Sequence, residues 1–351
     1  MTLFKQITDF DSSRSAYGQQ ARVEDTRAAA EGFRKTMLAG PKARYFRSFD
    51  LVKVPYPARY GLRNAFSRER LVEYVHIQNR VFVVQFDTEE GVKTMLVSPS
   101  DYERNGETPF FRRLQDNTPS LFTNMVVDRQ TTAPAVVASL GLKPEDIDYI
   151  TYDHLHTQDV RRWLGTDQEQ AVFPNAKLLV HWREWESTLD LNPYQADWYC
   201  PSGIAGVPED KVIKFDGSIM LGDGVALVHT PGHTEGNHSI VVHTDEGIWV
   251  TSENGISVDS YAPHLSTASG VANYAKTIGT EVIINGNTLE NSIDQYISMV
   301  QEKTIAGPSR RDPRFPNVFP SSEMTPFWAF PGAKPAFYVG EARHGKLHIP
   351  G

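Results

Sequence analysis

The spacing of apolar residues changes along the chain between the period typical of helices and the period typical of strands. In residues 12–39, alanines, Phe33 and Met37 interleave with Arg and Glu, and Gly40-Pro41 follows. This pattern predicts a helix that ends at residue 39. The next sixty residues alternate in the manner of strands and predict a β-rich block. Its predicted strands are residues 51–62, 71–88 and 91–99, with a turn at residues 88–91.

Short apolar runs alternate with amphipathic segments from residue 133 onward. Together with the β-rich start, this alternation predicts an α/β (α+β layered) domain whose strands are sandwiched between helices. The predicted helices are residues 133–140, 159–165, 181–189, 269–279 and 292–304, and residues 110–116 form a short amphipathic segment. The predicted strands are residues 149–153, 173–180, 247–255 and 281–286, with a strand–loop–strand unit over 226–244 and a hairpin turn at 222–224.

Three segments of different composition follow from these patterns. Residues 1–48 form a predicted N-terminal helical extension, and residues 49–304 form the layered domain. Residues 305–351 are rich in proline and aromatic residues, which predicts an extended C-terminal arm. Because a free tail with that many aromatic side chains would be poorly soluble, we expect the arm to pack on its own domain or on a second copy in a homo-oligomer.

Charge and cysteine content narrow the class of protein. The 351 residues carry a formal net charge of −8 without a long basic run, which argues against nucleic acid or an anionic membrane as the main partner. No stretch approaches the ~18–20 apolar residues of a membrane-spanning helix, and the N-terminus lacks a signal-peptide pattern. Cys200 is the only cysteine, so no internal disulfide can form. We expect a soluble, cytoplasmic protein.

Candidate metal ligands occur at two places in the chain. His154 and His156 follow a predicted buried strand, and two histidines at this spacing can face one point from an irregular loop. His233 lies between two apolar strands and is flanked by Gly232 and Gly236, which permit a tight backbone. Glu253 follows another apolar strand, where a buried carboxylate is costly unless it is paired or ligating.

These motifs, in this order, resemble those of the metallo-β-lactamase superfamily over residues 52–304. The resemblance is strongest in residues 135–159 and 225–242. It implies an αββα sandwich with a metal site at one edge, between the two sheets. The first metal site of the family uses the two histidines of a His-x-His-x-Asp-His motif and one histidine of a Gly-His-Thr motif. These positions correspond to His154, His156 and His233.

The second metal site is where this sequence departs from the family. The motif Asp falls on Gln158 and the following His on Asp159. The bridging acid of the family corresponds to Glu253, and the last His falls on Asn287. Asp159, Gln158 and Glu253 are therefore the candidate catalytic residues, and Asp159 and Glu253 are also candidate ligands. Three further candidates at the site are His264, Asn287 and Asp153, the last as a residue that orients the imidazole of His154.

The resemblance implies one or two divalent metal ions, with Zn as the usual metal of the family. A second site built from Asp159 and Glu253 would shift the preference toward Fe or Mn. The expected function is metal-dependent hydrolysis of an ester, lactone, amide or similar bond in a small molecule by metal-activated water. Two alternatives stay open: a di-iron oxidoreductase on the same fold, and a non-catalytic binding or regulatory protein with a degenerate site. Aromatic residues Tyr194, Trp198 and Tyr199 of segment 192–206 predict either a substrate wall or core contacts.

Overall fold

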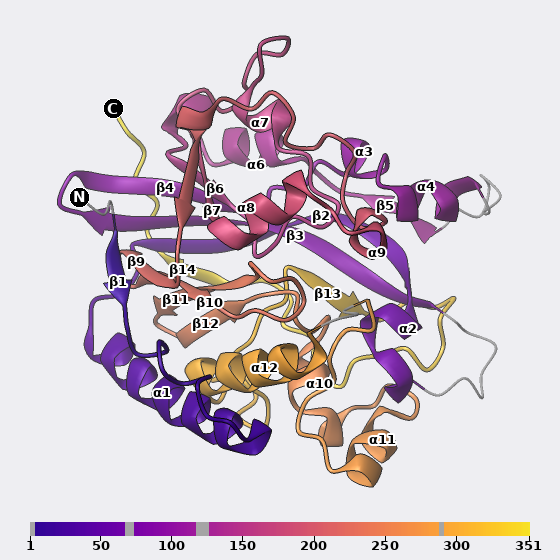
Figure 1. Cartoon of the computed structure of the whole chain (residues 1–351). Helices are drawn as coiled ribbons and strands as arrows, with labels where there is room; N and C mark the ends of the chain where they lie inside the picture. The colour runs from indigo at the N-terminus through magenta and orange to yellow at the C-terminus, as the bar shows by residue number, and fades with distance from the viewer. Residues whose placement is uncertain (1–3, 67–73, 117–125, 288–290) are drawn as a thin grey trace.

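The computed structural model describes residues 4–66, 74–116, 126–287 and 291–351 of the chain. Two β-sheets lie face to face, with helices on both outer faces (Figure 1). This αββα layering confirms the predicted fold class. The helices are α1 (Gln19–Ala39), α2 (Ala58–Gly61), α3 (Tyr102–Asn105), α4 (Pro109–Asp116), α6 (Ala133–Ser139), α7 (Arg161–Leu164), α8 (Trp182–Leu189), α9 (Pro193–Ala196), α10 (Val258–Tyr261), α11 (Val271–Ile278) and α12 (Ser292–Ala306).

The smaller sheet has the strand order β1-β9-β10-β11-β12, with every neighbouring pair antiparallel. The larger sheet runs β14-β2-β3-β4-β6-β7-β8, and β5 and β13 pair with β2 and β3. Its pairs β4–β6, β6–β7 and β7–β8 are parallel. The strands are β1 (Lys5–Ile7), β2 (Tyr45–Pro57), β3 (Tyr74–Thr88), β4 (Gly91–Val97), β5 (Asp128–Arg129), β6 (Tyr149–Thr151), β7 (Lys177–His181), β8 (Val212–Phe215), β9 (Ser218–Gly222), β10 (Val225–His229), β11 (His238–Thr244), β12 (Gly247–Thr251), β13 (Ser322–Thr325) and β14 (Arg343–Gly345).

Strand β3 shows how the sequence produces the layers. Phe82 and Val84 belong to the apolar core between the two sheets, where they join Leu227 and Val242 of the opposite sheet. The intervening Val81 and Val83 belong to the core beneath the outer helices, with residues of α6 and α7. Successive side chains of a strand point to opposite faces, so this continuous apolar run buries both faces of the sheet.

The two terminal segments are built into the layers. Strand β1 pairs with β9, and α1 lies beside α12 on the outer face of the smaller sheet (Figure 1). At the other end, β13 and β14 pair with β3 and β2 of the larger sheet. The C-terminal arm thus packs on its own domain, and residues on both sides of the predicted boundaries at 48 and 305 share sheets.

Several predicted elements differ in extent or type in the structure. The predicted strand 51–62 is part of β2, which begins at Tyr45 and ends at Pro57, where α2 follows. Helix α1 begins at Gln19 and not at residue 12, because the hydroxyls of Ser13 and Ser15 donate to the carbonyls of Phe10 and Ser12 and form turns there. The predicted strand 281–286 is wrong, because the backbone of this segment binds other loops: Ile283 N–H donates to the Ser260 carbonyl at 2.7 Å.

The hairpin turn between β9 and β10 is confirmed. Residues 71–73 of one predicted strand lie outside the described residues. No helix in the described ranges has both the length and the apolarity needed to cross a membrane.

Candidate metal centre

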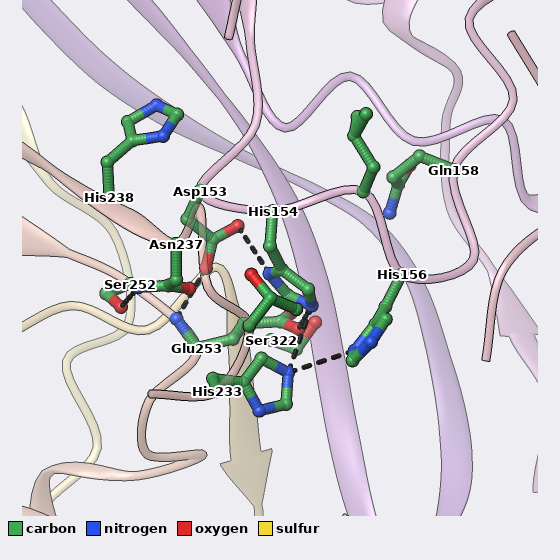
Figure 2. A network of polar contacts seen from close by, with 12 residues as sticks. Asp153, His154, His156, Gln158, His233, Asn237, His238, Ser252, Glu253 and Ser322 are labelled. Atoms are coloured by element: carbon green, nitrogen blue, oxygen red, sulfur yellow. Dashed lines mark hydrogen bonds and ion pairs between the residues drawn. The ribbon is translucent and has the colours of Figure 1, made fainter. Parts of the chain in front are cut away.

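Three buried histidines meet at one edge of the two sheets. His154 and His156 lie in the loop that follows β6, and His233 lies in the loop between β10 and β11. His233 Nε2 lies 3.1 Å from His154 Nε2 and 3.2 Å from His156 Nδ1 (Figure 2). The structure therefore brings together the three residues that the sequence placed in one site. Their ligand atoms all lie within 4.8 Å of one another.

The first histidine loop has an unusual backbone conformation. Thr157 has φ of 63°, in the left-handed region that a β-branched residue rarely adopts. Its N–H donates to the Trp198 carbonyl at 2.7 Å, which helps to hold the chain in this conformation. Strained residues of this kind occur often at functional sites, where the surrounding structure stabilises them.

The second histidine loop needs its glycines for two different reasons. Gly232 has φ of +137°, and a Cβ there would lie 2.1 Å from the backbone nitrogen of Gln295. Gly236 has an ordinary φ, but a Cβ there would lie 2.2 Å from the backbone nitrogen of Glu184. The loop therefore packs directly against α12 and α8, which positions His233.

Glu184 joins the two histidine loops, although the sequence patterns gave it no role. Its carboxylate is fully buried on α8 and accepts hydrogen bonds from the Leu155 N–H at 2.8 Å and the Tyr199 hydroxyl at 3.0 Å. The Thr234 hydroxyl donates to its other oxygen at 2.5 Å. The sequence did contain one indication of this role: Glu184 lies between Trp182 and Trp185 in the amphipathic α8. An acid on an apolar helix face needs polar partners.

Asp153 connects His154 with Glu253. One Asp153 oxygen lies 3.4 Å from His154 Nδ1, and the other accepts the Glu253 N–H at 2.5 Å (Figure 2). The side chain of Glu253 keeps 23% of its surface exposed, and its Oε2 lies 3.8 Å from His154 Nε2. Burial and the nearby Asp153 raise the pKa of Glu253, while His154 and the hydroxyls of Ser322 and Ser321 lower it.

The pKa values of the three imidazoles are shifted in different directions. Burial lowers the pKa of His156 and His233 well below the usual value, so both are neutral, as metal ligands must be. Burial also lowers the pKa of His154, but Asp153 and Glu253 outweigh it and raise the pKa to about 9, so a metal bound at His154 must displace its proton. His156 Nε2 lies 3.1 Å from Gln195 Oε1; because this amide oxygen can only accept, Nε2 carries the proton and Nδ1 presents its lone pair toward His233.

The aromatic segment contributes core contacts more than a substrate wall. Tyr199 packs edge-on against His156, with ring centroids 4.8 Å apart, and Trp198 stacks on Phe110 at 4.6 Å. Tyr194 is 75% exposed and lies outside the cavity beside the histidines. Of the two interpretations left open, the contacts of Trp198 and Tyr199 agree with the core.

Two candidate ligands lie away from the histidines. Asp159 is fully buried, but its oxygens accept hydrogen bonds from the backbone and guanidinium of Arg161, and Arg104 lies 3.8 Å away. Two arginines compensate the charge of Asp159, which is not grouped with the histidines, so its role as a metal ligand stays a prediction. His264 is exposed in the short 3-10 helix Pro263–Leu265 and faces a different surface depression, so it does not join the cluster either.

The histidines open onto a cavity of about 240 Å³. Gln158, Glu253 and Asn287 all line it, so these three candidates do lie beside the histidine cluster. Its remaining walls are mostly apolar. The apolar lining residues are Val52, Val54, Pro55, Ile77, Phe111, Leu114, Val126, Val127 and Ile256.

Comparisons with known proteins give partial sequence matches and a match in fold. No family model matches the chain. Over 111 residues it is 28% identical to an N-acyl homoserine lactonase from a Bacillus species, covering 32% of this chain and 39% of that protein. Over 129 residues it is 28% identical to the N-acyl homoserine lactonase AttM of Rhizobium radiobacter, covering 33% and 44%. The chain thus spans less than half the length of the relatives it matches.

The fold of one solved structure superposes on most of this chain. This structure is that of AidC, a dizinc quorum-quenching lactonase in complex with a product, with a TM-score of 0.50 and 13% sequence identity. The superposition covers 89% of this chain and 99% of that one, and at this identity it concerns the fold alone. With its two stacked sheets, outer helices and histidine cluster at the sheet edge, this chain is a protein of the metallo-β-lactamase fold.

Proposed function

We propose that this protein is a metal-dependent hydrolase that cleaves a lactone or a related ester of a small molecule, with one Zn held by His154, His156 and His233. The observation that carries the proposal is the convergence of three buried imidazole nitrogens, two pairs of which lie 3.1 and 3.2 Å apart. Two nitrogens at about 2.0–2.1 Å from one tetrahedral Zn lie about 3.3 Å apart, so the cluster fits this ion. Bound Zn would supply an activated water at neutral pH and polarise a carbonyl.

The surrounding side chains have separate roles in this proposal. Asp153 and Gln195 hold the imidazoles of His154 and His156 in orientation, at 3.4 and 3.1 Å. Glu253 lies 3.8 Å from His154 Nε2 and can accept a proton beside the cluster. Gln158 lines the same cavity, and its amide can orient a water or a substrate group by hydrogen bonding but cannot take a proton.

One metal, and Zn in preference to Fe or Mn, agrees with the donor set. Among the described residues that line the cavity, Glu253 is the only carboxylate. With Asp159 engaged by Arg161, the oxygen-rich second site that would favour Fe or Mn loses its second acid. This also removes the structural argument for a di-iron oxidoreductase. The lactone class is favoured because the partial relatives are lactonases by name.

Elemental analysis of protein purified without added metal tests the proposal. We expect about one equivalent of Zn, its loss in His156→Ala, and its retention in His264→Ala, a matched histidine away from the cluster. Hydrolysis of a panel of γ- and δ-lactones, followed by acid release, should stop with a chelator and return with Zn. Full metal retention in His156→Ala, or no hydrolysis of any lactone or aryl ester by the Zn-loaded protein, would contradict it.

A cytoplasmic location and self-association are separate proposals. The lone Cys200 is buried, and burial raises its pKa to about 12, so it stays a thiol and suits a reducing compartment. Trp328 in the C-terminal arm is 75% exposed and offers an apolar contact for a second copy of the chain. Sedimentation of the wild type and of Trp328→Ser measures that association.

A further inference from the structure

Six amide side chains line the cavity beside the histidines, and four of them have a buried carbonyl oxygen without a partner among the described residues. These four are Asn79 of β3, Gln158 of the first histidine loop, and Asn285 and Asn287 of the segment before α12. Asn285 and Asn287 are only 3% and 4% exposed. A buried acceptor without a partner is unfavourable, so this wall is suited to bind a ligand.

The orientation of two of these amides is determined by their other atoms. Asn285 Nδ2 donates to the backbone carbonyl of Glu253, and Asn79 Nδ2 donates to the Ser322 hydroxyl at 3.2 Å. Each NH₂ group is therefore engaged, and each carbonyl oxygen is the group without a partner among the described residues. The contact with the Glu253 backbone also places Asn285 beside the residue whose carboxylate lies 3.8 Å from His154 Nε2.

Such oxygens could bind either a cation or a hydrogen-bond donor. Neutral amides are weak metal ligands, and Glu253 is the only carboxylate among the described residues lining the cavity. A second divalent ion would thus lack the charge that usually holds it. Donor groups need no such charge, because an amide oxygen accepts up to two hydrogen bonds from N–H or O–H. A ligand that displaces water from this wall must bring donors of its own.

We propose that these four amides form a hydrogen-bond-accepting wall for the substrate in place of a second metal site. The substrate is then a largely apolar lactone or ester with an N–H or O–H donor close to the scissile carbonyl, since much of the remaining lining is apolar and includes Val54, Ile77 and Ile256. This inference rests on the proposed hydrolase function and deepens it. It assigns Asn285 and Asn287 to substrate recognition.

Calorimetric titration of the Zn-loaded protein tests the wall without relying on turnover. The probes are N-hexanoylglycine, which has an amide N–H, and N-hexanoylsarcosine, in which a methyl group replaces that hydrogen. We expect the wild type to bind the N–H ligand about tenfold more tightly, the effect of one or two neutral hydrogen bonds. Asn285→Leu and Asn287→Leu should reduce this ratio to about one, while Asn273→Leu, on an exposed position of α11, should keep it.

Metal analysis of the same variants separates the two uses of the amides. We expect Asn285→Leu and Asn287→Leu to keep the Zn content of the wild type. Loss of one of two metal equivalents in these variants would overturn the proposal, because the amides would then be metal ligands. Equal binding of both probes by the wild type, or binding of neither, would also overturn it. A failure of lactone hydrolysis with intact probe discrimination would contradict only the hydrolase function.

Discussion

The carboxylate of Glu184 accepts a hydrogen bond from the backbone N–H of Leu155, the residue between His154 and His156, at 2.8 Å. Because the same carboxylate also accepts from Thr234, directly after His233, one buried acid connects all three histidines. The order of the metal centre depends on this side chain, which is not itself near enough to the cluster to be grouped with the candidate ligands.

Replacing Glu184 with Ala should lower the free energy of unfolding by at least about 2 kcal/mol, because three donors lose their acceptor in the interior. The variant should also bind Zn more weakly, since both loops lose their common anchor. Urea unfolding and Zn titration measure the two effects. Glu186→Ala on the exposed face of the same helix is the matched control and should stay within about 0.5 kcal/mol. Unaltered Zn affinity in Glu184→Ala would show that the two histidine loops keep their conformation without the hydrogen bonds to Glu184.

Asp159→Asn should keep the full metal content and lower the stability by about 1–3 kcal/mol. The reason is that Asp159 pairs with Arg161 at 2.5 Å and lies apart from the histidines, and the arginines are partly exposed and can regain water. Elemental analysis and denaturant unfolding of the variant measure both outcomes. A fall in metal content at unchanged stability would instead support the ligand role predicted from the sequence.

Gly236→Ala should destabilise the protein by more than about 2 kcal/mol, because the new Cβ would lie 2.2 Å from the Glu184 backbone nitrogen and neither backbone can yield easily. Gly32→Ala is the matched control in helix α1, where a Cβ meets nothing within 4 Å. That variant should gain about 0.5–1 kcal/mol, since alanine favours a helix. Thermal unfolding of both variants compares them, and equal melting temperatures would refute the close approach.

Lowering the pH should reduce the free energy of unfolding, in part through His181. Burial, with help from nearby His229 and His238, lowers the pKa of this imidazole to about 2, against about 6.5 in an unfolded chain. Below pH 6.5 the unfolded chain binds a proton that the native state refuses, so the free energy of unfolding falls as pH falls from 6.5 toward 2. The contribution approaches about 1.4 kcal/mol per pH unit.

His181→Asn isolates this effect. An asparagine does not titrate, and its side chain can replace His181 Nδ1 as the acceptor of the Arg183 N–H at the start of α8. Unfolding free energies measured between pH 4.5 and 7 should therefore fall less steeply in the variant than in the wild type. An identical slope would show that other groups cause the acid sensitivity.

The sequence alone determined the layered fold and half of the site. The period of apolar positions identified β3 and α12, because strand and helix geometry impose that period locally. The spacing of motif residues identified His154 and His156, which are two residues apart after one strand. The flanking glycines identified His233, whose loop needs Gly232. Each of these features depends on neighbouring residues, which a sequence displays directly.

Only the tertiary structure decided which partners the buried acids have. Asp159 begins a predicted helix, Glu253 lies near the end of a predicted strand, and both were candidate ligands. In the structure Arg104 and Arg161 pair with Asp159, while Glu253 lies beside His154. Glu184 and Asn285 gained their roles from contacts with residues 29 and 32 positions away. A buried charge or amide is stabilised by whichever complementary atom the fold brings within about 3 Å, and sequence spacing does not specify that atom.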